Sequence, residues 1–98
     1  MSQTLICGAI RDRKLISFFY KDGERVVEPY LVGLNEKNHV ELVAWFVRGY
    51  SKSGRGMAWK QYLLSEMTSI RVLDEECGPR HSDYNPNDSR MSQIYCRV

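Results

Sequence analysis

Four apolar residues near the start of the chain recur at the spacing of one helix face: Leu5, Ile6, Ala9 and Ile10. Ser2 or Thr4 can serve as the N-cap, because a hydroxyl oxygen accepts a hydrogen bond from a free backbone N–H at a helix start. This pattern predicts a short amphipathic helix over residues 4–13.

β-Branched and aromatic residues follow, and they are typical of strands. Residues 15–20 (LISFFY) are apolar on both faces, and Asp22 and Gly23 then supply the residues that a tight hairpin turn requires. The returning strand covers residues 24–34 and carries Pro29 in its middle. Because proline cannot donate to a strand ladder, we expect a bulge or an edge position at Pro29.

Three further strands are predicted downstream, over residues 39–47, 59–64 and 69–73, with a turn at residues 65–68 between the last two. The strand at 39–47 is apolar on both faces toward one end, so both faces need to be covered there. Trp45 lies on its less apolar face, where we expect a helix to cover the ring rather than leave it as an exposed stacking surface.

A helix followed by five short antiparallel strands predicts a mostly β fold with flanking helices, built as a small barrel of the Sm or SH3 type. We place the barrel at residues 14–73 and treat residues 1–98 as a single domain. A hydrophobic content of 43% is sufficient for a core without a metal or a disulfide framework.

Residues 76–98 are expected as a C-terminal extension of the barrel. Their first part is polar and rich in turn formers, which predicts an extended strap. A short last helix is expected after Asn87 or Asp88 as its N-cap. Its apolar residues recur at helical spacing: Met91, Ile94, Tyr95 and Val98. We expect this stripe to dock on the barrel near Trp45.

Cys7, Cys77 and Cys96 are odd in number and far apart, and no Cys-x-x-Cys pair occurs. We expect them as unpaired thiols in a reducing cytoplasm. The start of the chain lacks the basic and apolar runs of a signal peptide, and no stretch approaches the ~18 apolar residues of a membrane helix. The sequence therefore predicts a cytoplasmic protein.

Catalytic and cofactor motifs find little support. Cys77, His81 and Asp83 have the side chains of a nucleophile, a base and an acid. The predicted strap, however, offers no rigid scaffold to hold a nucleophile and its base. Two histidines and scattered cysteines do not make a standard zinc site, and residues 53–56 (SGRG) lack the context of a phosphate-binding loop. We therefore predict no enzyme, no metal site and no cofactor.

The charge of the chain is nearly balanced, with 14 Lys and Arg against 12 Asp and Glu. Residues 48–62 depart from this balance, because they contain cations and rings but no acidic residue. These are Arg48, Lys52, Arg55 and Lys60, interleaved with Tyr50, Trp59 and Tyr62. Single-strand binding requires cations that follow phosphates and rings that stack on bases. In the alternative, Trp59 and Tyr62 belong to the barrel core and the cations lie on a solvated loop.

Tyr20 and Arg25 flank the predicted hairpin turn and are near neighbours across it. Either they form a second wall of a ligand pocket, or Tyr20 caps the barrel and Arg25 pairs with Glu28 or another acid. The pattern leaves both interpretations open.

Residues 9–34 (AIRDRKLISFFYKDGERVVEPYLVGL) resemble the start of a WYL domain. That family's pattern is an N-terminal helix, a strand with F-x-Y, a polar turn and an Arg-Val-x-Glu-Pro strand. Four residues match it as they stand: Tyr20, Arg25, Glu28 and Pro29. Of the trio that names the family, only Leu42 is kept.

Residues 59–75 (WKQYLLSEMTSIRVLDE) are similar to a second block of the same family. The matching positions are Lys60, Tyr62, Leu64 and Met67. Residues 80–91 (RHSDYNPNDSRM) are similar to the tail of small stand-alone members, so the resemblance covers residues 4–76 well and the tail more loosely.

WYL domains of bacterial transcription regulators are regarded as ligand sensors that bind single-stranded nucleic acid or nucleotide-like molecules. The resemblance implies a non-catalytic sensing or regulatory module of the same kind. With the basic and aromatic residues above, it predicts ligand contacts at Lys60, Arg48, Trp59, Tyr62, Tyr20, Arg25, Lys52 and Arg55.

The chain begins at its own first helix, so we expect it to act beside a partner protein such as a helicase, a nuclease or a DNA-binding regulator. The alternative is a structural or protein–protein interaction module, in which exposed edge strands join copies into a dimer or a ring.

Overall fold

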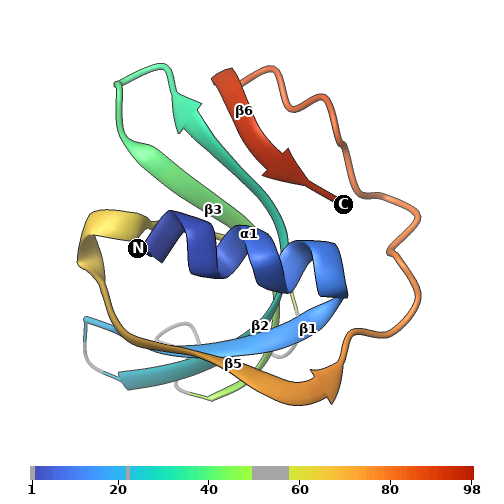
Figure 1. The fold of residues 1–98 in the computed structure, drawn as a ribbon. Coiled ribbons are helices and arrows are strands. Elements are labelled where there is room, and N and C mark those ends of the chain that lie inside the picture. The colour runs from blue at the N-terminus through green and yellow to red at the C-terminus, as the bar shows by residue number, and fades with distance from the viewer. Residues whose placement is uncertain (1, 22, 50–57) are drawn as a thin grey trace.

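The structure is a computed structural model that describes residues 2–21, 23–49 and 58–98 of the chain. Within these ranges it places one α-helix before six antiparallel strands (Figure 1). The elements are α1 (Ser2–Asp12), β1 (Lys14–Tyr20), β2 (Gly23–Asn35), β3 (Val40–Gly49), β4 (Ala58–Leu63), the 3-10 helix η1 (Leu64–Glu66), β5 (Met67–Glu76) and β6 (Met91–Arg97). The predicted N-terminal helix and the antiparallel strands after it are confirmed, and η1 takes the place of the last predicted turn.

The long strand β2 changes partner along one of its edges. β1 pairs with residues 23–27 of β2 and β6 pairs with residues 31–35, while β3 occupies the other edge. Pro29 lies between the two segments, and the pairing with β3 shifts register between Pro29 and Leu31. A residue without an N–H is thus tolerated where the ladder is interrupted, as predicted.

The sheet is open but strongly curved. Its strand order is β4-β3-β2-β1-β5, with β6 beside β2. Among the described residues, the end strands β4 and β5 do not pair with each other, so the sheet is not closed into a barrel. The ring of Tyr62 in β4 nevertheless lies 4.9 Å from the ring of Tyr20 in β1, although β3 and β2 separate these strands in the order. Neighbouring strands are about 4.8 Å apart, so a contact across two intervening strands requires the sheet to curl.

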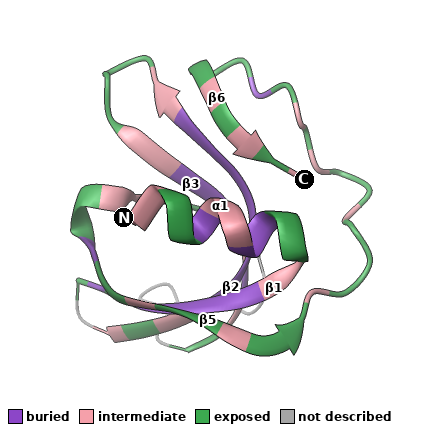
Figure 2. Cartoon of the chain, viewed as in Figure 1, coloured by how far each residue is buried: buried purple, intermediate pink, exposed green. Residues whose placement is uncertain are grey.

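The main hydrophobic core lies between α1 and the sheet (Figures 1 and 2). Ile6, Ala9 and Ile10 of α1 are buried in it, whereas Leu5, which the helical pattern placed on the same face, is exposed. The apolar stripe of the helix therefore positions α1, with Leu5 at its margin.

A second, smaller cluster covers the opposite face of the sheet. It consists of Leu31, Val43 and Met91, with Trp59, Tyr84 and Ile94 packed against them. Because side chains alternate along a strand, Val43 points away from its neighbours Leu42 and Ala44, which belong to the main core. Both faces of β3 are therefore covered, as its sequence predicts.

The predicted last helix is wrong, because Met91–Arg97 form the strand β6. The edge of β2 beyond Pro29 is left unpaired by β1, and β6 satisfies it. Gly33 permits the close approach, since a Cβ there would lie 2.6 Å from the carbonyl oxygen of Gln93. Tyr95, expected in an apolar helical stripe, is instead exposed.

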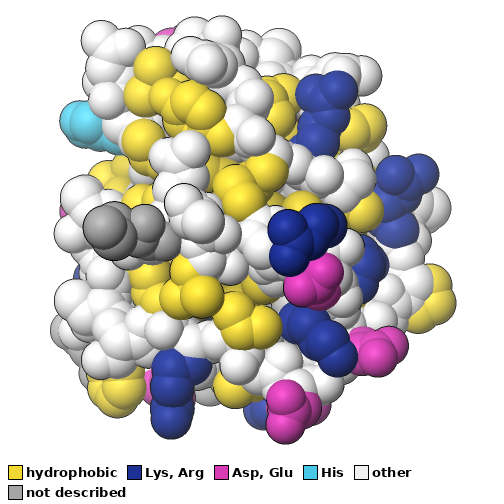
Figure 3. All heavy atoms as spheres, viewed as in Figure 1, with side chains coloured by type: hydrophobic (Ala, Val, Ile, Leu, Met, Phe, Trp, Pro, Cys, Tyr) yellow, Lys and Arg dark blue, Asp and Glu magenta, His cyan; other side chains and the backbone are white. Residues whose placement is uncertain are grey.

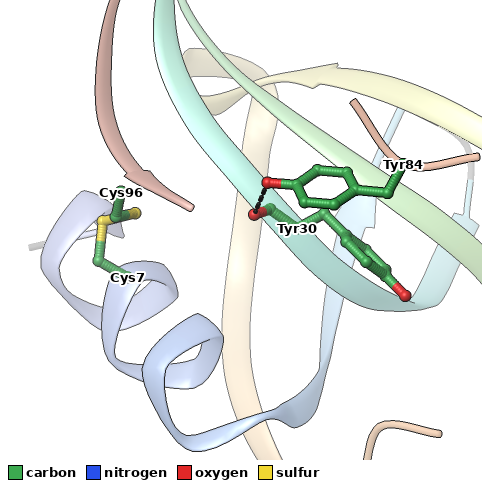
Figure 4. Close-up of a disulfide and its surroundings, with 4 residues drawn as sticks. All are labelled: Cys7, Tyr30, Tyr84 and Cys96. Atoms are coloured by element: carbon green, nitrogen blue, oxygen red, sulfur yellow. Dashed lines mark hydrogen bonds between the residues drawn. A yellow bond between two sulfur atoms is a disulfide. The ribbon is translucent and has the colours of Figure 1, made fainter. Parts of the chain in front are cut away.

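The expectation of three unpaired thiols is also wrong. Cys7 in α1 and Cys96 in β6 form a disulfide, and Cys77 is left as the free cysteine (Figure 4). Disulfides are typical of oxidising compartments, so this bond does not favour the predicted cytoplasmic location. Among the described residues, no helix has the length and apolar character that crossing a bilayer requires.

Candidate functional site

Five rings gather on the sheet face that lies away from α1. They come from β2, β3, β4 and the strap, which we define as residues 77–90: Tyr30, Trp45, Trp59, His81 and Tyr84. His81 lies over Trp45 with ring centroids 4.1 Å apart, and Trp59 meets Tyr30 edge-on at 4.9 Å. The strap, rather than the predicted helix, therefore covers Trp45.

The strap is held on the sheet mainly through Tyr30. The backbone N–H of His81 donates to the Tyr30 hydroxyl at 3.1 Å, and the Tyr84 hydroxyl donates to the Tyr30 carbonyl oxygen at 3.3 Å (Figure 4). Glu28 adds two contacts, because it accepts from the Gly78 N–H at 3.1 Å and lies 3.3 Å from His81 Nε2. These contacts fix the path of the strap on both sides of residues 82 and 83.

A hollow of about 560 Å³ lies beside these rings at β4. It is lined by Val43, Trp59, Lys60, Gln61, Asp83 and Arg90, and we call it the β4 hollow. β4 ends the strand order, so side chains from both of its faces reach the same space. Its volume lies within the range of small-molecule sites in proteins.

Two cations line the β4 hollow. Within the described residues, no carboxylate lies in ion-pair range of Lys60. Arg90 is oriented by Asp88, whose carboxylate accepts from Arg90 Nε at 2.9 Å and from Nη2 at 2.5 Å. This hydrogen bonding lowers the pKa of Asp88 and raises that of Arg90. The Arg90 side chain is still 53% exposed, which leaves donors open to a ligand.

A second hollow of about 190 Å³ adjoins the first. Gln61 and Arg90 line both, and the second one adds residues from the end of β2, the start of β3 and the turn between them: Asn35, Glu36, Lys37 and Glu41. The Gln61 carboxamide lies against the Arg90 guanidinium. The two hollows therefore meet at one cationic side chain.

Lys60 and Trp59 are the two predicted contact residues that the structure brings together in the β4 hollow. Arg48 is not among its lining residues. Its guanidinium donates to both carboxylate oxygens of Glu75 in β5, with an Nη1–Oε2 distance of 3.0 Å, and this lowers the pKa of Glu75. Lys52 and Arg55 lie outside the described residues.

Tyr62 and Tyr20 belong to the main core rather than to a ligand surface. Tyr62 is 3% exposed and packs edge-on against Tyr20 and Phe18, and burial raises the pKa of its hydroxyl. The Tyr20 hydroxyl accepts from the Leu63 N–H at 3.1 Å, while Arg25 donates to the Tyr20 carbonyl oxygen. Of the alternatives that the sequence left open, the core interpretation holds for these two rings.

Asp83 and Arg90 were not predicted as site residues. The Trp59 indole N–H donates to Asp83 Oδ2 at 2.9 Å, which attaches the strap to β4. Arg90 reaches β4 because β6 begins directly after it at the edge of β2. The sequence signal was weak in both cases, because each residue stands in a segment of mixed charge.

Cys77, His81 and Asp83 do not form a catalytic constellation. Burial raises the pKa of the Cys77 thiol to about 11, and Glu28 adds to the shift. The thiol is therefore protonated at neutral pH, and the protonated form is a poor nucleophile. No group of three or more His, Cys, Asp or Glu side chains within the described residues could hold a metal ion.

Basic side chains also lie on the face that carries α1 (Figure 3). Figure 3 shows Lys and Arg side chains mainly along one side of this face, with Asp and Glu among them.

The chain matches no protein-family model, and neither a curated protein nor a solved structure is significantly similar to it.

Proposed function

We propose that the protein is a non-catalytic sensing or regulatory module that binds single-stranded nucleic acid or a nucleotide-like ligand at the β4 hollow. One observation carries the proposal: Lys60, which no described carboxylate neutralises, lines the same hollow as Trp59 and Arg90. A free cation beside an aromatic ring is the combination that phosphate and base binding require.

In this proposal Lys60 and Arg90 contact phosphate oxygens. Arg90 takes the role that the sequence assigned to Arg48, because Arg90 lines the β4 hollow and Arg48 does not. Trp59 offers the stacking surface, since it is half-buried while Tyr62 is enclosed in the core. Asp88 holds Nε and Nη2 of Arg90, so a phosphate oxygen contacts the guanidinium through its remaining N–H groups.

The WYL-type resemblance agrees with this proposal but does not carry it. We interpret the sheet as an incompletely closed barrel of the Sm or SH3 type. Two contacts across the curl support that interpretation, the packing of Tyr62 on Tyr20 and the ion pair between Arg48 of β3 and Glu75 of β5. The raised pKa of Cys77 argues against this thiol as a nucleophile.

A charge reversal at Lys60 tests the function. Lys60→Glu should weaken binding of a short single-stranded oligonucleotide by at least ~10-fold at low salt, with a shallower dependence on salt concentration. Arg71→Glu is the matched control, because Arg71 is exposed on β5 and makes the same kind of charge change away from the hollow. If the two variants lose equal binding affinity at unchanged melting temperatures, the loss is an effect of net charge and not of a site at Lys60.

The second candidate is an interaction module. β4 and β5 end the strand order, and each has one edge that pairs with no other described strand. Such edges can pair with another copy of the chain. Light scattering after size exclusion would favour this function if it gave a dimer or larger species whose mass does not change with salt concentration.

A further inference from the structure

The β4 hollow contains a carboxylate as well as two cations. Asp83 lines it together with Lys60 and Arg90, and no Lys, Arg or His among the described residues lies in ion-pair range of the Asp83 side chain. A carboxylate in this position repels phosphate. A ligand that places N–H donors on Asp83 and an anionic group on the two cations would complement the charges of the hollow.

The orientation of this carboxylate is set by Trp59. The indole N–H donates to Asp83 Oδ2 at 2.9 Å, so one oxygen is held against β4. A carboxylate accepts about four hydrogen bonds, which leaves most of its capacity for a ligand. Asp83 is one of several anchors of the strap, because His81 and Tyr84 also attach it to Tyr30 on either side of Asp83.

We infer that Asp83 selects a guanine base, an inference that rests on the proposed nucleotide site. The Watson–Crick edge of guanine presents two adjacent donors, N1–H and the 2-amino group, which match the two oxygens of a carboxylate. Adenine and cytosine place an amine beside a ring nitrogen that is an acceptor, and that nitrogen repels a carboxylate. Uracil places its single N–H between two carbonyl groups.

The arrangement divides the contacts of one guanine nucleotide among the residues of the hollow. The base lies beside Trp59 with its donor edge on Asp83, and the phosphate contacts Lys60 and Arg90. Bidentate recognition of a base typically discriminates against the wrong base by about 5- to 150-fold. The preference is a property of Asp83, whereas phosphate affinity is a property of the cations.

The experiment compares the dissociation constants of GMP, IMP, AMP and UMP by calorimetry at low salt. GMP should bind at least ~10-fold more tightly than AMP or UMP, and IMP, which lacks the 2-amino group, should fall between them. In Asp83→Asn the preference for GMP should disappear, while AMP should bind as well as before or better. The asparagine oxygen can still accept from Trp59, so the strap is preserved, and equal melting temperatures would verify this.

The outcomes separate this inference from the proposed function. If all four nucleotides bind equally and Lys60→Glu weakens each of them, the nucleotide site stands and the role of Asp83 is wrong. A preference for GMP that survives in Asp83→Asn would also overturn it. If no nucleotide and no oligonucleotide binds, the proposed function itself fails. The comparison of GMP with IMP needs no variant, so it holds even if Asp83→Asn is unstable.

Discussion

Cys7 in α1 and Cys96 in β6 are joined by a disulfide, although they are 89 positions apart along the chain. The bond closes nearly the whole chain into one loop and attaches its last strand to its first helix (Figure 4). A cross-link over such a loop stabilises chiefly by restricting the unfolded chain. The position of β6, and of Arg90 directly before it, is therefore secured covalently as well as by pairing with β2.

Reduction of this disulfide should lower the melting temperature clearly. Removing a native disulfide from a small domain typically costs about 2–5 kcal/mol, and 1 kcal/mol corresponds to roughly 4–8 °C at this size, so we expect a fall of at least ~8 °C. Scanning fluorimetry with and without reductant measures it. Cys96→Ser is the control and should not respond to reductant. Thiol titration verifies that the disulfide has been reduced. If the reduced wild-type protein then melts at the same temperature as the oxidised one, the prediction is contradicted.

Gly33→Ala should destabilise the protein because the new Cβ would lie 2.6 Å from the Gln93 carbonyl oxygen and push β6 away from β2. Overpacking of this kind costs about 1–3 kcal/mol. Gly8→Ala provides the matched control, since its Cβ would meet only Arg11 at 3.9 Å and alanine favours a helix by up to about 1 kcal/mol. Denaturant unfolding should move the two variants in opposite directions, and a harmless Gly33→Ala would argue against the pairing of β6.

Tyr62→Ala should reduce the free energy of unfolding by about 3–5 kcal/mol, because it empties a buried ring position beside Phe18 and Tyr20. Tyr95→Ala makes the same chemical change at a ring that is 37% exposed, and it should stay within about 0.5 kcal/mol of the wild type. A stable Tyr62→Ala protein that had lost only nucleotide binding would restore Tyr62 as a stacking residue.

Stability should depend on the ionisation of Asp88 in acid. The hydrogen bonds from Arg90 lower the pKa of the folded Asp88 below its ordinary value of about 3.9, so the unfolded chain binds the proton first as the pH falls. The contribution is fully present above that ordinary value and is lost as the pH drops through the folded pKa. As the pH falls through this acid range, the melting temperature should fall less for Asp88→Asn than for the wild type. Asp74→Asn changes an exposed carboxylate and is the control, so its melting temperature should fall as much as that of the wild type.

The sequence predicted α1 and the strands β1 to β5 well because their signals are local. Alternation, the Asp22–Gly23 turn and the helical spacing of Ile6, Ala9 and Ile10 each depend on near neighbours along the chain. Pro29 was informative for the same reason. The predicted Sm- or SH3-type barrel is not confirmed, since the observed sheet is open. Closure depends on which distant edges pair, and no local pattern specifies that.

The prediction for the C-terminus failed for a tertiary reason. Met91, Ile94, Tyr95 and Val98 fit one helix face, but the free edge of β2 beyond Pro29 offers backbone hydrogen bonds that favour a strand. Cys96 is a further apolar residue of this segment, and it packs against the main core. Counting it as apolar would have weakened the helical pattern. The same edge determines where Arg90 and Asp83 lie, so the site could be predicted only as far as Lys60 and Trp59.

The central claim concerns where the ligand binds, and an amide N–H correlation spectrum measures this directly. The chain has two tryptophans, so the indole N–H signals of Trp45 and Trp59 report separately on the covered ring and on the hollow. Titration with a ~6-nucleotide single strand at about 50 mM salt should shift the Trp59 indole and the amides of Lys60, Gln61 and Arg90 to saturation, and about 200 mM salt should weaken the effect. Shifts confined to β5 and β1, or no shifts at low salt, would contradict a binding site at the β4 hollow.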